Sequence, residues 1–151
     1  MTLADVAWAH AEQTRLFRGF QRTLRDYDLV LAPTVPVSPF PWTQLYLAEI
    51  DGKPLLNYYH WLALTYVITL ATNPAIALPC GRDHAGMPFG LQVIGRFRGD
   101  RALLGAAHSM QQAFDAMPAL RRPLPDAGKL SAPVAELKSI VTHPPVTVAK
   151  T

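Results

Sequence analysis

The residues most able to do chemistry in this chain are its serines and lysines, which together can cleave an amide bond. A serine hydroxyl becomes a nucleophile when a base takes its proton, and hydrogen-bond donors must then stabilise the oxyanion. The chain contains four of each: Ser38, Ser109, Ser131, Ser139, Lys53, Lys129, Lys138 and Lys150. No serine lies in a Gly-Ser-Ser-Gly or Gly-x-Ser-x-Gly context. The lysines fall in expected turns or in the tail, where burial does not lower a pKa. We therefore interpret all of them as surface groups and assign no catalytic residue to this chain.

Cys80, with His84 four residues later, is the other candidate nucleophile. A cysteine–histidine pair needs a particular geometry, and its members usually lie far apart in sequence. We interpret Cys80 instead as a small buried side chain at the end of a strand. The five histidines show no His-x-x-x-His or Glu-x-x-His spacing, and no Gly-Lys-[Ser/Thr] phosphate loop is present. We expect no metal and no cofactor.

Aromatic residues gather beside a proline-rich stretch. The set comprises Phe40, Trp42, Tyr46, Tyr58, Tyr59 and Trp61. Aromatic side chains can line a small-molecule pocket because they combine apolar contact with a hydrogen-bonding edge. We select Trp42, Tyr46, Tyr59 and Trp61 as candidate substrate-binding residues. The alternative is that these side chains pack the proline-rich loop onto the domain.

The composition narrows the class of protein. The 151 residues suffice for one domain with a core; half are hydrophobic and 17% are charged, against the usual value of about 25%. So few charges indicate an apolar face that further protein covers, although a proline-rich, self-sufficient domain is the alternative. The net charge is +3, and the arginines of the first expected helix are balanced by acids. Nothing therefore favours nucleic-acid binding.

The expected location is the cytoplasm. The amino terminus lacks the basic and apolar segments of a signal peptide. The nearly uncharged run 62–80 raises the question of a membrane span, but an Asn-Pro pair interrupts it, so we expect none. One cysteine excludes an internal disulfide and suits a reducing compartment.

These residues must be positioned by a few helices and strands. Apolar residues at helical spacing predict a helix over 3–25, which Thr2 and Asp5 start. The apolar run 29–32 predicts a short strand covered on both faces. Prolines at 33, 36, 39 and 41 predict an extended, irregular loop after that strand. A turn at 51–54 then leads to a helical segment over 57–72, which is too long for one strand.

The second half of the chain predicts two strands and one helix. Residues 75–78 and 91–94 are the strands, which form a hairpin or lie apart in the sheet. Asp100 predicts the N-cap of a helix over 101–117. The inner face of that helix holds Leu103, Leu104, Ala107, Met110, Gln111 and Phe114. Residues 126–151 are expected to be a loosely attached tail, in which 135–141 can form a short helix.

Three ordered blocks resemble the amidase signature family. Residues 26–36, Asp-Tyr-Asp-Leu-Val-Leu-Ala-Pro-Thr-Val-Pro, resemble its DVLLTPT-x-P segment. Residues 71–81, Ala-Thr-Asn-Pro-Ala-Ile-Ala-Leu-Pro-Cys-Gly, resemble its GxPAISVPCG block. Residues 86–96, Gly-Met-Pro-Phe-Gly-Leu-Gln-Val-Ile-Gly-Arg, are similar to GLPVGLQLIGR. With the Leu and Ala pairs that follow, the resemblance covers about residues 1–117.

The resemblance implies an α/β fold. This chain would form the carboxy-terminal part of an amidase signature fold, with about three to four strands of a mixed β-sheet flanked by helices. Family members hydrolyse carboxamides through an acyl-serine, using a Lys–Ser–Ser arrangement in an upstream Gly- and Ser-rich segment that this sequence lacks. We therefore expect residues 1–125 to supply scaffold and a wall of the substrate pocket, and 126–151 to be the tail. The implied partners are an upstream catalytic half and a small amide substrate.

The segment 58–62 bears on substrate choice. Members that act on glutamine-like substrates tend to have acidic or polar groups there, whereas this segment is aromatic and neutral. The resemblance thus implies preference for an apolar or aromatic acyl group, and we expect the isolated chain to be inactive. The alternative function is a non-enzymatic module that binds a partner or itself through an exposed apolar face and open strand edges.

Overall fold

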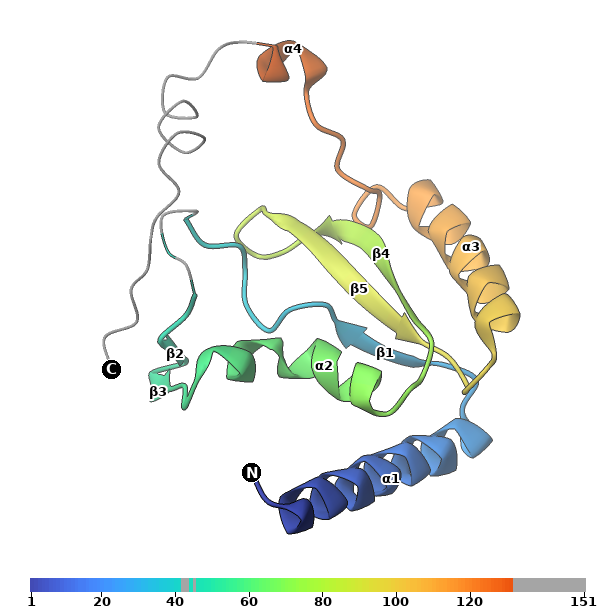
Figure 1. The fold of residues 1–151 in the computed structure, drawn as a ribbon. Helices are drawn as coiled ribbons and strands as arrows, with labels where there is room; N and C mark the ends of the chain where they lie inside the picture. Colours follow the sequence, from blue (N-terminus) through green and yellow to red (C-terminus); the bar gives the residue numbers. More distant parts are fainter. Residues whose placement is uncertain (42–43, 45, 132–151) are drawn as a thin grey trace.

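The computed structural model describes residues 1–41, 44 and 46–131 (Figure 1). The elements are α1 (Leu3–Asp26), β1 (Val30–Pro33), β2 (Glu49–Ile50), β3 (Lys53–Pro54), the 3-10 helix η1 (Tyr58–Leu62), α2 (Ala63–Leu70), β4 (Ala75–Arg82), β5 (Pro88–Ile94), α3 (Asp100–Ala116) and α4 (Ala127–Leu130). Helices flank a small antiparallel sheet, which is the predicted α/β class. Within the described residues, every helix is too short or too polar to cross a membrane.

The main sheet has three strands in the order β1-β5-β4, and both pairs are antiparallel. Strands β4 and β5 form a hairpin, which decides the choice that the sequence left open, and both are longer than predicted. The Asp83 carboxylate closes their turn by accepting hydrogen bonds from the Ala85 and Met87 amides, each at 2.9 Å. The central strand is therefore β5, and each outer strand leaves one edge open among the described residues.

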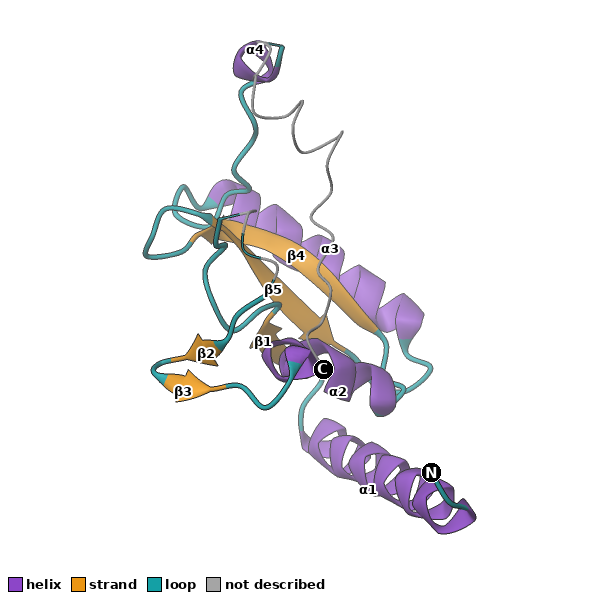
Figure 2. Ribbon diagram, turned by 60° about the vertical axis from the view of Figure 1, so that its left-hand side comes forward, coloured by secondary structure: helices purple, strands orange, loops and turns teal. Residues whose placement is uncertain are grey.

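Two helices cover opposite faces of the sheet (Figures 1 and 2). On one face, Leu103 and Ala107 of α3 join Leu78 and Val93 in the core. The other face meets the helix α2, where the Gln92 side-chain amide donates to the Leu64 carbonyl at 2.9 Å.

Alternating side chains of a strand point to opposite faces. The neighbours Val93 and Ile94, at 0% and 1% exposure, show that both faces of β5 are covered. This central strand is the best-buried element of the described chain and fixes the positions of the elements around it.

The first helix begins and ends close to its prediction. The Asp5 amide donates to the Thr2 hydroxyl at 3.2 Å, and the Thr2 amide donates to the Asp5 carboxylate at 2.6 Å. This reciprocal pair is a capping box, and it lowers the pKa of the Asp5 carboxyl. Helix α1 contacts the rest of the fold through an edge-to-face pair of Phe17 and Phe97, with ring centroids 5.2 Å apart.

Two expectations about buried faces are wrong. Strand β1 lies at an edge of the sheet, and Leu31, on the same face as its partner Val93, is 52% exposed rather than covered. Leu104 of α3 is 58% exposed instead of facing inward. Helix α3 contacts β4 and β5. The face that it packs against them holds fewer of its apolar residues than the sequence pattern predicted.

The expected cap of α3 is also wrong. Gly99 is the N-cap and makes no side-chain hydrogen bond, while Asp100 is the first residue of the helix. The Gly99 amide donates to the Arg96 carbonyl at 2.8 Å, so a tight turn brings the chain into the helix one residue earlier. A carboxylate in the first turn still interacts favourably with the helix dipole.

The remaining segments follow the prediction in part. The turn at 51–54 joins the two-stranded hairpin β2–β3, with Asp51 and Gly52 at φ +50° and +71°, as a type I′ turn requires. The helical segment 57–72 divides into η1 and α2. Helix α4 occupies the start of the predicted tail; the short helix suggested over 135–141 lies outside the described residues.

Candidate functional site

Three of the four residues selected as substrate contacts belong to one aromatic cluster. Tyr58 is at its centre, with its ring centroid 5.9 Å from Tyr46, 5.6 Å from Tyr59 and 6.2 Å from Trp61. Each pair is edge to face, an arrangement that aromatic rings prefer. Phe40 of the proline-rich loop also packs edge to face on Trp61, with ring centroids 5.9 Å apart. Trp42, the fourth selected residue, lies outside the described residues.

The cluster adjoins an apolar hollow on the outer side of α2. The hollow has a volume of about 530 Å³ and is lined by Tyr59, Leu62, Thr65, Tyr66, Thr69 and Leu70. Five of these six side chains were not selected from the sequence, because a helical run of apolar residues is also what a buried core helix shows. Their spacing along one helix face is the signal that identifies the hollow once α2 is known to have an uncovered side.

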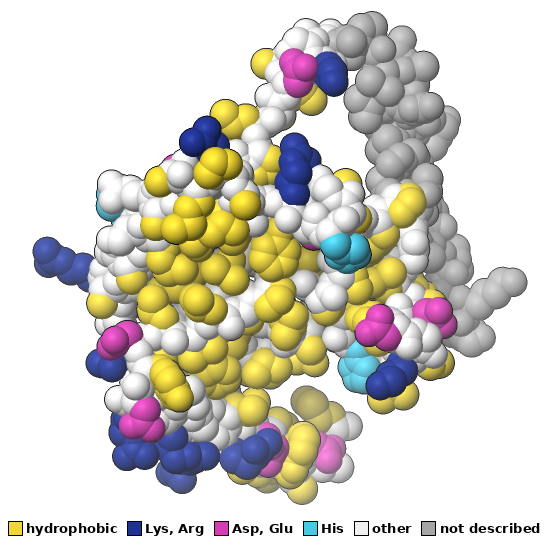
Figure 3. All heavy atoms as spheres, turned by 180° about the vertical axis from the view of Figure 1, so that it is seen from behind, with side chains coloured by type: hydrophobic (Ala, Val, Ile, Leu, Met, Phe, Trp, Pro, Cys, Tyr) yellow, Lys and Arg dark blue, Asp and Glu magenta, His cyan; other side chains and the backbone are white. Residues whose placement is uncertain are grey.

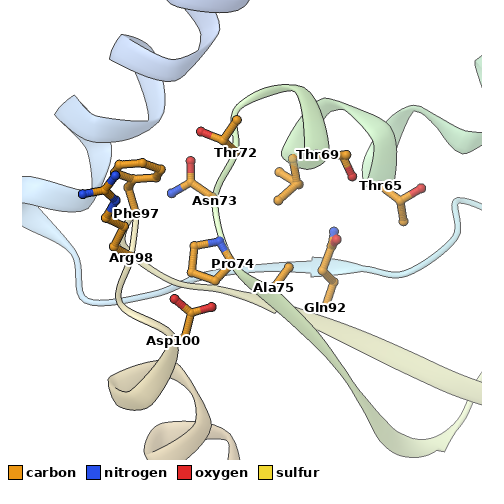
Figure 4. Close-up of a pocket in the computed structure, with 11 residues that line it drawn as sticks. Thr65, Thr69, Thr72, Asn73, Pro74, Ala75, Gln92, Phe97, Arg98 and Asp100 are labelled. Carbon is orange, nitrogen blue, oxygen red and sulfur yellow. The ribbon is translucent and has the colours of Figure 1, made fainter.

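A second, more polar hollow lies where α2, β4 and the segment after β5 meet (Figure 4). In the close-up, Thr72, Asn73 and Pro74 lie between the α2 threonines and the pair Phe97–Arg98. Asn73 is 8% exposed, and its side-chain amide donates to the Gly95 carbonyl at 2.8 Å.

The carbonyl oxygen of the Asn73 side chain is buried without a partner among the described residues. A buried acceptor without a donor is costly. This hollow is therefore a place where another group can supply a hydrogen bond.

Backbone strain borders the polar hollow on both sides. Thr72 has φ +56° and Arg98 has φ +58°, values that side chains other than glycine rarely adopt. Arg98 also lies over the Phe97 ring, with its guanidinium carbon 5.2 Å from the ring centroid. Neither conformation could be predicted from residue type, since neither residue is a glycine or asparagine.

The proline-rich loop after β1 is held against the β4–β5 hairpin. The Thr34 hydroxyl donates to the Gly90 carbonyl at 3.1 Å. The neighbouring Ser38 hydroxyl, with weaker contributions from the hydrogen-bonded Met87 and Ala85 amides, lowers the pKa of the Asp83 carboxyl. Ser38 and Asp83 therefore line the same small hollow between the loop and the hairpin.

Cys80 belongs to β4 and is half-buried. Burial raises the pKa of its thiol, which disfavours the thiolate that a nucleophile needs. Among the described residues, no three His, Cys, Asp or Glu side chains come together in a way that could hold a metal ion.

Comparison with known proteins identifies the family. The Amidase family profile matches residues 2–104. A glutamyl-tRNA(Gln) amidotransferase subunit of Prochlorococcus marinus is 38% identical over 109 residues, which are 72% of this chain and 21% of that protein. The corresponding subunit of Halalkalibacterium halodurans is 34% identical over 113 residues, 74% of this chain and 22% of that protein. The chain thus spans about a fifth of the length of these curated relatives.

Solved structures show the same fold. A glutamyl-tRNA(Gln) amidotransferase subunit of Thermotoga maritima matches with a TM-score of 0.58 and 30% identity, over 76% of this chain and 24% of that one. A 6-aminohexanoate cyclic dimer hydrolase matches with a TM-score of 0.59 and 29% identity, over 82% of this chain and 26% of that one. The helices and antiparallel sheet described above are therefore the fold of a segment of these enzymes. With the profile covering well over half of its residues, this chain belongs to the amidase signature family.

Proposed function

We propose that this chain supplies the scaffold and part of the substrate pocket of an amidase that hydrolyses carboxamide C–N bonds. The acyl-serine would form on a catalytic segment that these 151 residues do not contain, and the chain alone would be inactive. In this proposal residues 1–125 are the amidase-like unit, and 126–151 are a tail that the unit does not need.

The observation that carries the proposal is the apolar surface left uncovered on both sides of the sheet. Leu31 on β1, Tyr59 and Leu70 beside the hollow, and Leu104 on α3 are 52%, 65%, 43% and 58% exposed. Figure 3 shows apolar side chains spread across the middle of one face of the molecule. Exposed apolar area of this kind marks a contact with further protein.

The free strand edge of β4 and the polar hollow also favour a catalytic segment as the partner of this chain. Strand β4 pairs only with β5 among the described residues, so the other edge of its eight residues is free to bond another strand. The unpartnered Asn73 carbonyl borders the start of this edge. A catalytic segment that packs here would supply both the missing strand and a donor for Asn73.

The aromatic cluster and the adjoining hollow favour an apolar or aromatic acyl group. In the part of the chain that the structure describes, the lining of the hollow offers tyrosine rings, leucines and threonine hydroxyls but no charged side chain. A substrate with a charged α-amino acid group would lose its hydration there without gaining an ion pair.

The experiment is an amide-hydrolysis assay of the purified chain and of the chain co-expressed with the catalytic segment of a solved relative. We expect no turnover by the chain alone, and turnover of benzamide-like amides above that of glutamine in the assembled protein. Tyr59→Ala should raise the KM for a benzamide-like amide about fivefold, because roughly 1 kcal/mol of ring contact is lost.

Tyr27→Ala is the matched control for that variant, since Tyr27 is 64% exposed and lies at the end of α1, away from the hollow. Hydrolysis by the pure chain that one of its own substitutions abolishes would refute the scaffold role. A clear preference for glutamine would refute the proposed pocket.

The second candidate is a non-enzymatic module that binds a partner or itself through the same apolar face. The edges of β1 and β4 that no described strand pairs with favour it, because unpaired strands template further pairing. Light scattering separates the possibilities: a concentration-dependent dimer supports self-association. A stable monomer argues against an exposed face that needs a partner.

A further inference from the structure

Three arginines of α1 line one shallow hollow. Arg18, Arg22 and Arg25 follow one another at helical spacings of four and three residues, and all three are exposed. With Phe17 and Gln21 they line a volume of about 460 Å³. In Figure 3, Lys and Arg side chains gather at the lower left, which is the end of the molecule where α1 lies in the reverse view of Figure 1.

Among the described residues, these arginines lack the kind of acidic partner that Arg15 of the same helix has. Arg15 bonds Glu12 at 2.7 Å, but within the described residues no carboxylate lies within 4.0 Å of Arg18, Arg22 or Arg25. Asp26 follows Arg22 by four residues and still does not pair with it. Like charges at these spacings destabilise a helix, so an external anion would relieve the repulsion.

The hollow offers donors and an apolar side, and its described lining contains no acidic side chain. Beside the three guanidinium groups lies the Gln21 side chain, whose amide nitrogen is buried without a partner among the described residues. Phe17 adds an apolar contact next to the charges. Guanidinium groups bind planar carboxylates through paired hydrogen bonds, so the chemistry of the hollow matches carboxylate side chains carried on an apolar frame.

We propose that this arginine hollow of α1 docks an acidic polypeptide segment of a partner protein, with glutamate or aspartate at positions i, i+4 and i+7 of a helix. Arg18 and Arg25 are seven residues apart, about 10 Å along the axis, which equals the span of those three positions. Asp26 and Asp28 lie just beyond the arginines. They would repel the continuous phosphate backbone of a nucleic acid, whereas a short acidic helix ends before reaching them.

The test is fluorescence anisotropy of the intact chain with a rhodamine-labelled helical peptide that carries three glutamates at i, i+4 and i+7. The controls are the same peptide with three glutamines and a single-stranded oligonucleotide of similar length. We expect saturable binding of the glutamate peptide that weakens as salt rises. Arg22→Gln should raise its Kd about three- to fivefold, and the triple Arg18, Arg22 and Arg25 substitution at least about thirtyfold.

The matched control is Arg15→Gln, on the same helix but already paired with Glu12, which should change the Kd less than about twofold. All the substituted side chains are exposed, so circular dichroism should show an unchanged fold; if the triple variant unfolds, the single variants decide. Equal binding of the glutamine peptide, equal effects of Arg15→Gln and Arg22→Gln, or tighter binding of the oligonucleotide would each overturn the proposal.

Discussion

Replacing Thr72 with glycine should stabilise this protein, although the change removes a side chain. Thr72 follows the C-cap of α2 in the left-handed conformation, at φ +56°. Its amide donates to the Thr69 carbonyl at 3.0 Å, so the hydrogen bonding of the helix end imposes this conformation. The family block GxPAISVPCG has glycine at the position of Thr72, which is the residue that this backbone favours.

The size of the effect follows from two opposing terms. The left-handed conformation costs a residue with a Cβ roughly 1–2 kcal/mol. Against this gain, glycine loses about 0.5–1 kcal/mol of stability, because its unfolded chain has more conformational freedom to give up on folding. The Thr72 side chain is exposed, so its removal costs little packing. The net gain is about 0.5–1 kcal/mol in the free energy of unfolding, or about 1–4 °C in Tm for a chain of this length.

The assay is thermal and urea unfolding followed by circular dichroism at matched protein concentration. Thr72→Ala separates the causes, because alanine removes the β-branch but keeps the Cβ, and it should gain less than glycine. Thr69→Gly is the control within α2, because Thr69 is an exposed helical residue. This change should lower the free energy of unfolding by roughly 0.3 kcal/mol. If Thr72→Gly were no more stable than Thr72→Ala, the left-handed backbone would not be the source of strain.

Three further predictions concern stability. Gly81 has φ +65°, and a Cβ there would collide with the Ala119 carbonyl oxygen, so Gly81→Ala should lower the free energy of unfolding in urea by about 2–4 kcal/mol. Gly105→Ala, in open space on α3, should raise it by about 1 kcal/mol. Val93→Ala, at a side chain with 0% exposure, should cost roughly 2 kcal/mol; a loss under half of that would contradict the packed core. The Ser38 hydroxyl lowers the pKa of the Asp83 carboxyl from its ordinary value of 3.8. The ionised carboxylate therefore stabilises the fold above pH 3.8, and this contribution is lost as the pH falls through the lower pKa of the folded state. Asp83→Asn should remove that part of the acid dependence in a Tm series, and an unchanged series would show that the carboxylate is not held as described.

The sequence by itself predicted the elements whose signals are local. The capping box of α1, the helical run after residue 57 and the two apolar strands each depend on residues close in sequence. The missing nucleophile context could also be read directly, because it depends on residue types rather than on positions in space. The aromatic residues predicted a cluster, but not that Tyr58 would be its centre.

The tertiary structure decided which faces are covered and where the backbone is strained. An apolar residue looks the same in sequence whether a neighbour reaches it or not, and only the edge position of β1 and the limited contact of α3 leave Leu31 and Leu104 exposed. Thr72 adopts a glycine conformation because the end of α2 and the start of β4 fix its backbone from both sides. Local propensity therefore chose the helices and strands, while contacts between distant segments set the pairing, the open edges and the hollows that a partner or substrate can occupy.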